Sequence, residues 1–287
     1  MKVAFGTVVY KESFKYHQEF IESINNQDSN DFDIVLLNDN LNEEEFNKVS
    51  NSLQKKVITW YGKPNSLTSE LRVQLIKNAK ENGYDLLILG DFDDTFSRNR
   101  VSKIISEYED AFSFYYNDLY YINTQRKFFH NLPQHIRRID DIMECNFLGL
   151  SNTALNLKKI DYKLIDKLNE KNILVFDWYM YSILLKNTHI GKKIEDCKTY
   201  YRIHENNIAG ENKDKIDDIK REINVKINHY MRLRRFDTQY NGLLDFYKRL
   251  KLEVDNGEIL LLNYIDRDNE YWWGRLKSNK IRVEKNL

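Results

Sequence analysis

The segment YDLLILGDFDDTF, residues 84–96, decides the fold. Residues 86–89 are apolar without interruption, as is typical of a strand that is buried on both faces of a parallel sheet. A cluster of acidic residues follows at once, at Asp91, Asp93 and Asp94. The segment therefore predicts a buried strand that ends in carboxylates.

Three strand and helix pairs precede this strand. The predicted strands are apolar runs at residues 3–10, 33–39 and 57–61, and the segments with helical spacing lie at 14–25, 43–53 and 66–82. Such alternation predicts an α/β fold with a mostly parallel central sheet flanked by helices. Ligands of such sheets bind at the carboxyl ends of the strands, where the acidic cluster lies.

The alternation breaks after residue 112. Aromatic segments at 112–116 and 120–123 and a charged stretch at 126–141 follow, then helical patterns at 152–168 and 178–186 and an extended run at 199–203. Beyond residue 210 we expect a mainly helical extension, with amphipathic helices at 213–236 and 240–252 and a small hairpin built from 258–264, Trp272, Trp273 and 281–283. The predicted domains are therefore residues 1–210 and 211–287.

Composition narrows the class of protein. The 287 residues include 44 basic and 44 acidic side chains, so no overall charge favours nucleic acid. Hydrophobic residues make up 41%, and no run of about 18 apolar residues predicts a membrane span. The start of the chain has no pattern of a signal peptide, and the two cysteines have neither metal-type nor redox spacing. We expect a globular cytoplasmic protein.

The acidic cluster favours a metal site. Side chains at i and i+2 of an extended chain project to the same side, so Asp91 and Asp93 can face one cleft. Mg²⁺ and Mn²⁺ prefer carboxylate oxygen and complete their ligand shells with phosphates and water. The alternative is an acidic turn after a strand.

Several motifs carry a resemblance to a known family. GDFDD at residues 90–94 resembles the DxD element of GT-A glycosyltransferases. FLG at 147–149, FDWY at 176–179 and YRIHENNIAG at 201–210 resemble the glycine loop, the base segment and the closing signature of family 2, especially of its rhamnosyltransferase-like members. The resemblance covers about residues 1–210 and implies the GT-A fold.

The resemblance also implies roles for individual residues. Asp39 would contact the nucleotide base, Arg72 would lie near the donor, and Asp91 would face the ribose or diphosphate. Mn²⁺ or Mg²⁺ would be held by Asp93 and His204. The remaining implied contacts are Thr7 and Arg202 with the donor, and Gly149 and Trp178 with the acceptor.

Asp177 is the candidate general base. A base of this kind removes the proton of an acceptor hydroxyl, and its apolar neighbours would raise its pKa. The alternative is that Asp177 caps the helix that follows.

The implied activity is transfer of a sugar from a UDP or dTDP sugar to a hydroxyl of a glycan or lipid-linked glycan, with inversion, in bacterial surface polysaccharide synthesis. Arg232, Arg234 and Arg235 end the first C-terminal helix. They permit peripheral contact with the inner face of the plasma membrane or a homo-oligomer through the C-terminal helices, although docking on the catalytic domain is favoured.

Two other functions remain open. DFDDT at residues 91–95 also fits the DxDxT element of haloacid-dehalogenase-type phosphatases, in which Asp91 would be the nucleophile. That family places the element at its first strand, whereas three strand and helix pairs precede it here. The third reading is a noncatalytic module that binds nucleotide sugars.

Overall fold

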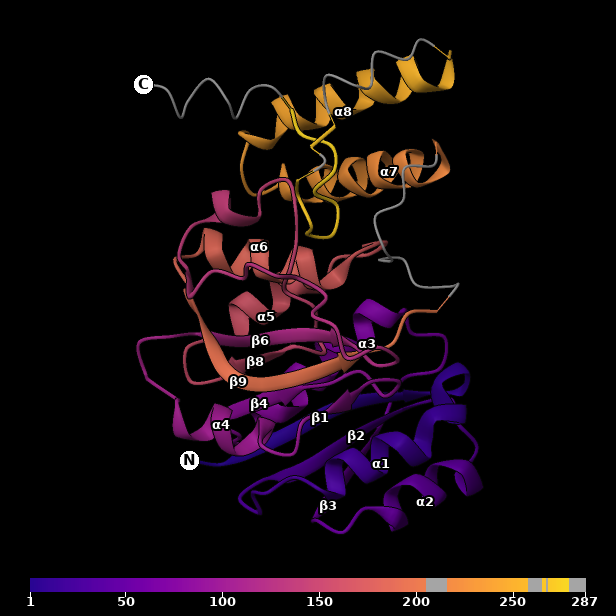
Figure 1. The fold of residues 1–287 in the computed structure, drawn as a ribbon, viewed down its shortest axis with the longest axis vertical. Coiled ribbons are helices and arrows are strands. Elements are labelled where there is room, and N and C mark those ends of the chain that lie inside the picture. Colours follow the sequence, from indigo (N-terminus) through magenta and orange to yellow (C-terminus); the bar gives the residue numbers. More distant parts are fainter. Residues whose placement is uncertain (205–215, 258–264, 267, 279–287) are drawn as a thin grey trace.

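A mixed sheet forms the centre of the computed structural model, which describes residues 1–204, 216–257, 265–266 and 268–278. Within these residues the order of the strands is β3-β2-β1-β4-β8-β6-β9-β5, and β7 pairs with β9 outside this path. The arrangement is the mixed α/β fold that the alternation of strands and helices predicts, and Figure 1 shows its layers.

The first half of the sheet is parallel, as predicted. Its strands are β1 (Val3–Tyr10), β2 (Asp33–Asp39), β3 (Val57–Tyr61) and β4 (Leu86–Leu89). Between them lie the 3₁₀ helix η1 (Lys11–Tyr16), α1 (His17–Asn25), α2 (Glu43–Ser52) and α3 (Thr68–Glu81). After α3 the chain turns at Gly83, whose φ of +73° is a conformation that glycine adopts without strain.

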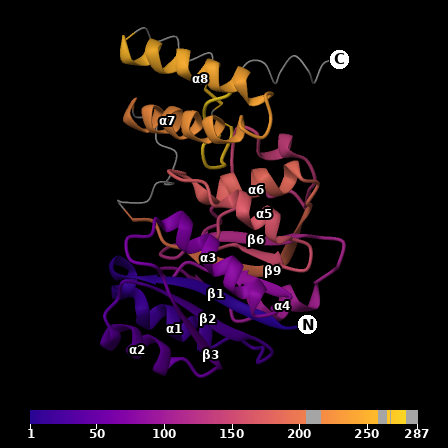
Figure 2. The same cartoon turned by 180° about the vertical axis from the view of Figure 1, so that it is seen from behind.

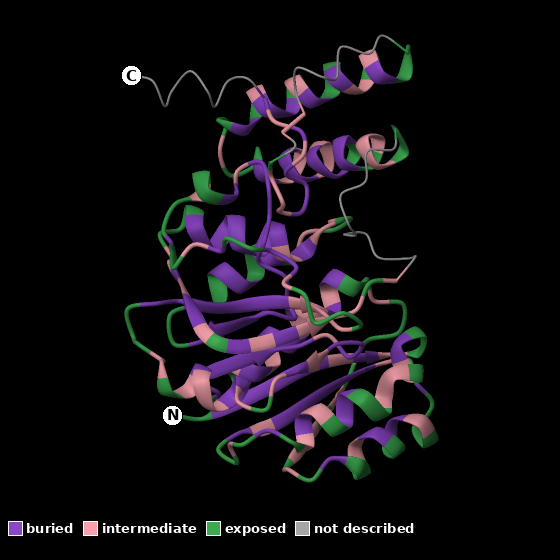
Figure 3. Cartoon of the chain, viewed as in Figure 1, coloured by how far each residue is buried: buried purple, intermediate pink, exposed green. Residues whose placement is uncertain are grey.

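Apolar side chains alternate between the two faces of these strands. Leu87 and Leu89 of β4 join the cluster that includes α3, whereas Leu86 and Ile88 join the cluster that includes α1 and α2. The sheet is therefore buried on both sides, and Figure 3 shows its strands mostly in the colour of buried residues. This explains why β4 reads as a continuous apolar run.

The second half of the sheet departs from the predictions. Residues 152–168 are not one helix, because β8 (Thr153–Asn156) precedes α5 (Tyr162–Leu168). The strand β8 is fully buried and antiparallel to both β4 and β6 (Phe114–Tyr121), so its sheet neighbours override the helical pattern. The aromatic segments form this one strand β6, and the extended run belongs to the longer β9 (Gly191–Tyr201).

Short elements complete this half of the fold. They are β5 (Thr95–Phe96), α4 (Arg100–Ser106), β7 (His135–Ile136), η2 (Ile139–Ile142) and α6 (Phe176–Lys186). Figures 1 and 2 show α5 and α6 stacked over the sheet beside β6.

The C-terminal helices are α7 (Ile216–Leu233) and α8 (Tyr240–Asp255). They lie side by side beyond α6, at the end of the molecule opposite α2 and β3 (Figures 1 and 2). Their apolar residues join the same hydrophobic cluster as α6, and the ring of Tyr230 stacks on those of Tyr240 and Tyr247. None of the helices in the described part of the chain is long and apolar enough to cross a membrane.

Described residues beyond α8 pair with one another and with the segment between β6 and β8. Isolated antiparallel bridges pair Ile265 with Leu276 and Asn146 with Trp272. The expected domain boundary near residue 210 and the expected hairpin residues 258–264 and 281–283 lie outside the described residues. The division at residue 210 stays a prediction.

Candidate active site

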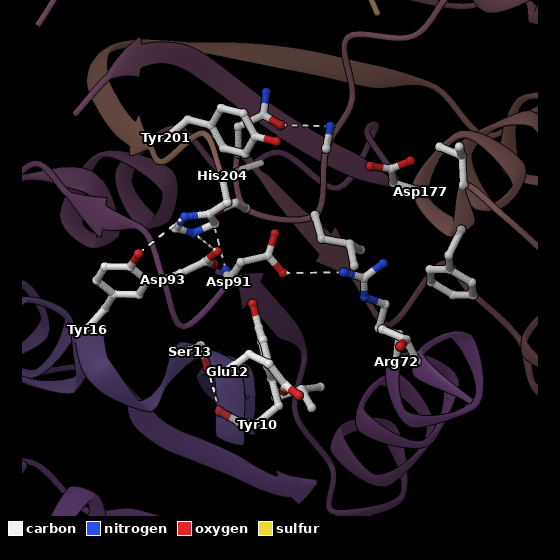
Figure 4. Close-up of a pocket in the computed structure, with 18 of the residues that line it drawn as sticks. Tyr10, Glu12, Ser13, Tyr16, Arg72, Asp91, Asp93, Asp177, Tyr201 and His204 are labelled. Carbon is white, nitrogen blue, oxygen red and sulfur yellow. Dashed lines mark hydrogen bonds and ion pairs between the residues drawn. The ribbon is translucent and has the colours of Figure 1, made fainter. Parts of the chain in front are cut away.

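A pocket of about 480 Å³ opens at the carboxyl ends of the parallel strands. Its volume lies within the range of about 300–1,000 Å³ that is common for small-molecule sites. The structure brings seven residues that the sequence singled out to this pocket: Asp39, Arg72, Asp91, Asp93, Gly149, Asp177 and His204. They come from segments far apart in the sequence, and Figure 4 labels Arg72, Asp91, Asp93, Asp177 and His204 among them.

Asp93 and His204 meet on one side of the pocket. His204 Nε2 lies 2.9 Å from Asp93 Oδ2. The other ring nitrogen, Nδ1, lies 3.3 Å from the hydroxyl of Tyr16, and the two rings are stacked. Tyr16 therefore orients the imidazole so that Nε2 faces the carboxylate (Figure 4). Of the closing signature, Asn207 and Gly210 lie outside the described residues.

This pair fits a divalent cation. One carboxylate oxygen and one imidazole nitrogen are ligands that Mn²⁺ accepts, and two protein ligands leave room for diphosphate oxygens and water. Among the described residues no group of three or more His, Cys, Asp or Glu side chains is placed to hold a metal ion.

Asp91 lies beside the positively charged side chain of Arg72. Its Oδ1 lies 3.7 Å from an Arg72 guanidinium nitrogen, and its backbone N–H donates to the Ser151 hydroxyl. Burial raises the pKa of Asp91 and the charge of Asp93 adds to that rise, while Arg72 opposes it. Burial beside Asp93 and Asp91 likewise raises the pKa of Tyr10, whose hydroxyl stays protonated.

Asp177 lies across the pocket from Asp93 and His204 (Figure 4). It is the second residue of α6, and the extended residue Val175 is the N-cap, so the capping alternative for Asp177 is wrong. Its Oδ1 accepts from the Trp178 backbone N–H and from Asn146 Nδ2. Burial raises its pKa to about 6. A carboxylate with this pKa is a stronger base than an exposed aspartate.

Asp39 lies at the far end of β2 and is half-buried. Its Oδ1 accepts a hydrogen bond of 2.8 Å from Asn40 Nδ2, and burial raises the pKa of the carboxyl. Because Asp39 ends the strand beside β1, its carboxylate borders the same pocket as Tyr10 and Arg72.

Three predicted contacts lie elsewhere. Trp178 is fully buried: its Nε1 donates to the Ile142 carbonyl, and its ring stacks on that of His229. It is therefore a core residue, and the predicted contact of Trp178 with the acceptor is wrong. Thr7 is 1% exposed and borders a separate cavity of about 20 Å³ beside Arg72.

Arg202 also lies outside the lining of the main pocket. Its backbone N–H donates to Asp94, its Nε to the Asp93 carbonyl, and a terminal nitrogen pairs with Glu19. Arg202 thus fixes the end of β9 against the acidic loop. A direct contact with the donor stays a prediction.

Arg100 is a structural residue that the sequence did not reveal. It is fully buried, and its guanidinium donates to the carbonyls of Leu89 and Ser151 and to Asn117 Oδ1. It therefore fixes the end of β4 and the loop before β8. An arginine in an amphipathic helix usually reaches solvent, so no sequence pattern predicted that Arg100 is buried.

Tyr10, Glu12, Tyr16 and Trp272 also border the pocket without having been predicted. Tyr10 ends β1, and Glu12 and Tyr16 lie in η1 directly after it, so the strand-end rule that selected the acidic cluster could have selected them.

Comparison with known proteins identifies the family. The sequence model of the family described as Glycosyl transferase family 2 matches residues 5–161, more than half of the chain. A search of curated proteins gave no match.

Solved structures share the fold at low sequence identity. S. aureus TarS 1–349 in complex with UDP-GlcNAc has a TM-score of 0.54 at 16% identity, over 86% of this chain and 71% of that one. A longer TarS structure has a TM-score of 0.53 at 14% identity, over 81% of this chain, which spans only 40% of its length. The mannosyltransferase PcManGT from Pyrobaculum calidifontis, in complex with GDP-Man and Mn²⁺, has a TM-score of 0.50 at 9% identity, over 82% and 64%.

The matched residues include the parallel half of the sheet, Arg72, the acidic cluster and Gly149. The likeness to TarS and PcManGT extends to the rest of the fold. The chain belongs to glycosyl transferase family 2 and has the GT-A fold.

Proposed function

We propose that this protein transfers one sugar from a nucleoside diphosphate sugar to a hydroxyl of a glycan or lipid-linked glycan, with inversion at the anomeric carbon. One observation carries the proposal: the Asp93–His204 pair and the base candidate Asp177 line opposite sides of a single pocket. This arrangement supports a leaving group on one side and an incoming hydroxyl on the other.

Asp93 and His204 would hold Mn²⁺ or Mg²⁺. When bound, the cation neutralises the negative charge that develops on the departing diphosphate. Arg72 supplies a fixed positive charge beside Asp91, and the Tyr16 hydroxyl, 3.3 Å from Nδ1, orients the ring of His204. These residues therefore bind and orient the diphosphate end of the donor.

Asp177 accepts the proton of the acceptor. As its carboxylate removes that proton, the acceptor oxygen bonds to the anomeric carbon and the bond from that carbon to the phosphate oxygen breaks. The nucleoside diphosphate leaves with the bonding electron pair. Because attack and departure occur on opposite faces of the sugar, the anomeric configuration inverts.

The family and the ligands of two neighbouring structures support a nucleotide sugar as the donor. TarS was solved with UDP-GlcNAc and PcManGT with GDP-Man, so both neighbours bind nucleotide sugars. For this chain we propose a UDP or dTDP sugar that carries a hexosyl or deoxyhexosyl group. We further propose a role in bacterial surface polysaccharide synthesis at the cytoplasmic side of the membrane.

The two alternatives predict different chemistry. The family match includes Asp91–Thr95, which removes the basis for a phosphatase with Asp91 as its nucleophile. A noncatalytic module would bind the donor and never release a nucleoside diphosphate.

A screen of nucleotide sugars tests the proposal. UDP, dTDP and GDP, each free and with sugars attached, are added with Mn²⁺, with Mg²⁺ or with EDTA, and the melting temperature is measured. We expect a rise with one nucleotide class that EDTA abolishes, and release of that nucleoside diphosphate from its sugar. Stabilisation without any release on a panel of glycoside acceptors would favour the noncatalytic module.

A further inference from the structure

Trp272 belongs to the catalytic pocket although it lies far beyond the segment that the family model matches. The match ends at residue 161, whereas Trp272 comes after both C-terminal helices. Its side chain borders the same pocket as Gly149, Asp177 and Tyr201. The C-terminal extension therefore contributes part of the lining of this pocket.

The indole ring is pressed against the backbone of Gly149. A Cβ atom added at Gly149 would lie 3.2 Å from both Cη2 and Cζ3 of Trp272, tighter than an ordinary van der Waals contact. Glycine at this position lets the ring approach the loop before β8. The loop that the sequence linked to the acceptor is thus covered on one side by this ring.

Trp272 is held in place by residues of the segment between β6 and β8. The Asn146 backbone N–H donates to the Trp272 carbonyl at 2.8 Å, and the rings of Phe128 and Phe129 lie 5.6 and 5.0 Å from the indole. The adjacent Glu270 accepts hydrogen bonds from the backbone of residues 130 and 131. These contacts fix the ring without help from a ligand.

A buried polar network anchors the residues that follow. Lys226 of α7 is fully buried and donates to the carbonyls of Glu144 and Leu276. The Glu144 carboxylate accepts from the Ser278 backbone N–H, and Glu222 accepts from the Leu276 backbone N–H. Residues of α7, of α8 and of the segment between β6 and β8 thus hold the residues that follow Trp272.

The lining of the pocket includes both charged and apolar side chains. Asp91, Asp93, Arg72 and His204 make one side charged, which suits a diphosphate and its cation. Leu150, Val175 and Trp272 add apolar side chains to the lining, and Asn146, whose side chain donates to the Asp177 carboxylate, donates its backbone N–H to the Trp272 carbonyl.

We infer that Trp272 is the residue of the C-terminal extension that selects the acceptor, by contact of its ring with the apolar face of a sugar. This inference rests on the proposed function and names the subsite of the acceptor. The acceptor sugar packs against the indole, which directs its hydroxyl to Asp177.

Substitution at Trp272 tests the inference against a matched neighbour. Trp272→Leu keeps apolar bulk and removes the aromatic face, and Trp272→Ala removes the bulk as well. Trp273→Phe is the control, because Trp273 lies next to Trp272, is also buried and does not line the pocket. Melting temperatures show which variants are folded, and the Leu variant serves if the Ala variant does not fold.

We expect the acceptor KM to rise about 10-fold in Trp272→Ala, in line with the usual worth of an aromatic contact. The donor KM and the hydrolysis of the donor without acceptor should stay within about twofold, as for Trp273→Phe. An unchanged acceptor KM in folded Trp272→Leu and Trp272→Ala overturns the inference, and so does an equal rise of both KM values.

A binding measurement separates this inference from the proposed function. Saturation-transfer NMR with a panel of simple alkyl glycosides, in the presence of UDP or dTDP and Mn²⁺, requires no turnover. If glycosides bind the wild type and not the Trp272 variants while no nucleotide sugar is consumed, the inference stands and the transferase fails. If the wild type turns over sugars and binds glycosides equally well with and without Trp272, the inference fails alone. If it binds no glycoside, the inference fails.

Discussion

His204 and Asp93 are 111 residues apart in the sequence, and the imidazole Nε2 of one lies 2.9 Å from the carboxylate Oδ2 of the other. Asp93 follows β4 and His204 follows β9, and these strands lie apart in the sheet. Arg202 joins the two segments, because it donates to the carbonyl of Asp93. The fold thus brings together, from two distant parts of the chain, the two side chains that we propose as metal ligands.

The first prediction concerns this pair. Asp93→Asn and His204→Ala each remove one ligand, so we expect the affinity for Mn²⁺ in the presence of UDP or dTDP to fall at least about 100-fold. Isothermal titration measures it. The control is His135→Ala, which removes an exposed imidazole outside the pocket. Unchanged Mn²⁺ affinity in both ligand variants would exclude the pair as a metal site.

The second prediction concerns Tyr16. Tyr16→Phe keeps the ring that stacks on His204 and loses the hydroxyl that meets Nδ1, so the imidazole loses its orienting partner. We expect about a 10-fold loss of Mn²⁺ affinity with little change in stability. Tyr61→Phe, at a side chain that is 61% exposed, is the control. A loss of the same size in the control would show that the measurement does not report on His204.

The third prediction concerns the base. In Asp177→Asn the amide cannot accept a proton from the acceptor, so kcat should fall by about 10²–10⁴. Donor binding should persist, because Asp177 lies across the pocket from the charged side. Steady-state transfer and thermal shift with the nucleotide measure the two effects. Transfer at the wild-type rate would remove Asp177 from this role.

The fourth prediction is a pH dependence. Burial and the charge of Asp91 raise the pKa of Asp177 to about 6 against the opposing charge of Arg72. Below that pH the carboxyl is protonated and cannot act as a base. We expect kcat/KM to fall tenfold per pH unit below about pH 6 and to be level above it.

The concentration of Mn²⁺ separates this titration from that of a metal ligand. A proton on a metal ligand would compete with the cation, so an acidic limb caused by a metal ligand would move as Mn²⁺ is increased. The fall of kcat/KM that Asp177 causes should stay at the same pH when Mn²⁺ is increased. A limb that disappears at saturating Mn²⁺ would contradict the assignment.

The fifth prediction concerns stability. Arg100→Met leaves the carbonyls of Leu89 and Ser151 and the Asn117 amide without their buried donor. We expect the free energy of unfolding to fall by about 3 kcal/mol. Denaturant unfolding measures it, with Arg98→Ala at an exposed position as the control. A loss no larger than in the control would mean that the three acceptors find other donors.

The parallel half of the fold follows from local patterns. In β1, β2 and β4 the strands are mostly apolar because both faces of the sheet are buried there, whereas β3 at the edge of the sheet is only partly buried. The strand β8 could not be predicted in this way. Its four residues are buried between β4 and β6, and that contact exists only after the chain has folded.

The candidate site likewise contains some residues that local patterns predict and others that only the tertiary structure reveals. Asp91, Asp93 and Asp39 follow strands directly, so the strand-end rule selects them. Trp178 was misassigned because its motif places it beside Asp177, whereas on a helix the next residue points elsewhere, here into the core. Trp272 had no signal, since its place in the pocket depends on contacts with Asn146 and Gly149 that only the tertiary structure provides.

The central claim is that Asp93 and His204 together bind the cation of the donor complex. A crystal structure with Mn²⁺ and the nucleoside diphosphate that stabilises the protein most tests it directly through the anomalous signal of manganese. We predict one peak at about 2.1 Å from both Asp93 Oδ2 and His204 Nε2, with diphosphate oxygens completing the ligand shell. Bound nucleotide whose manganese peak contacts neither side chain would contradict the account.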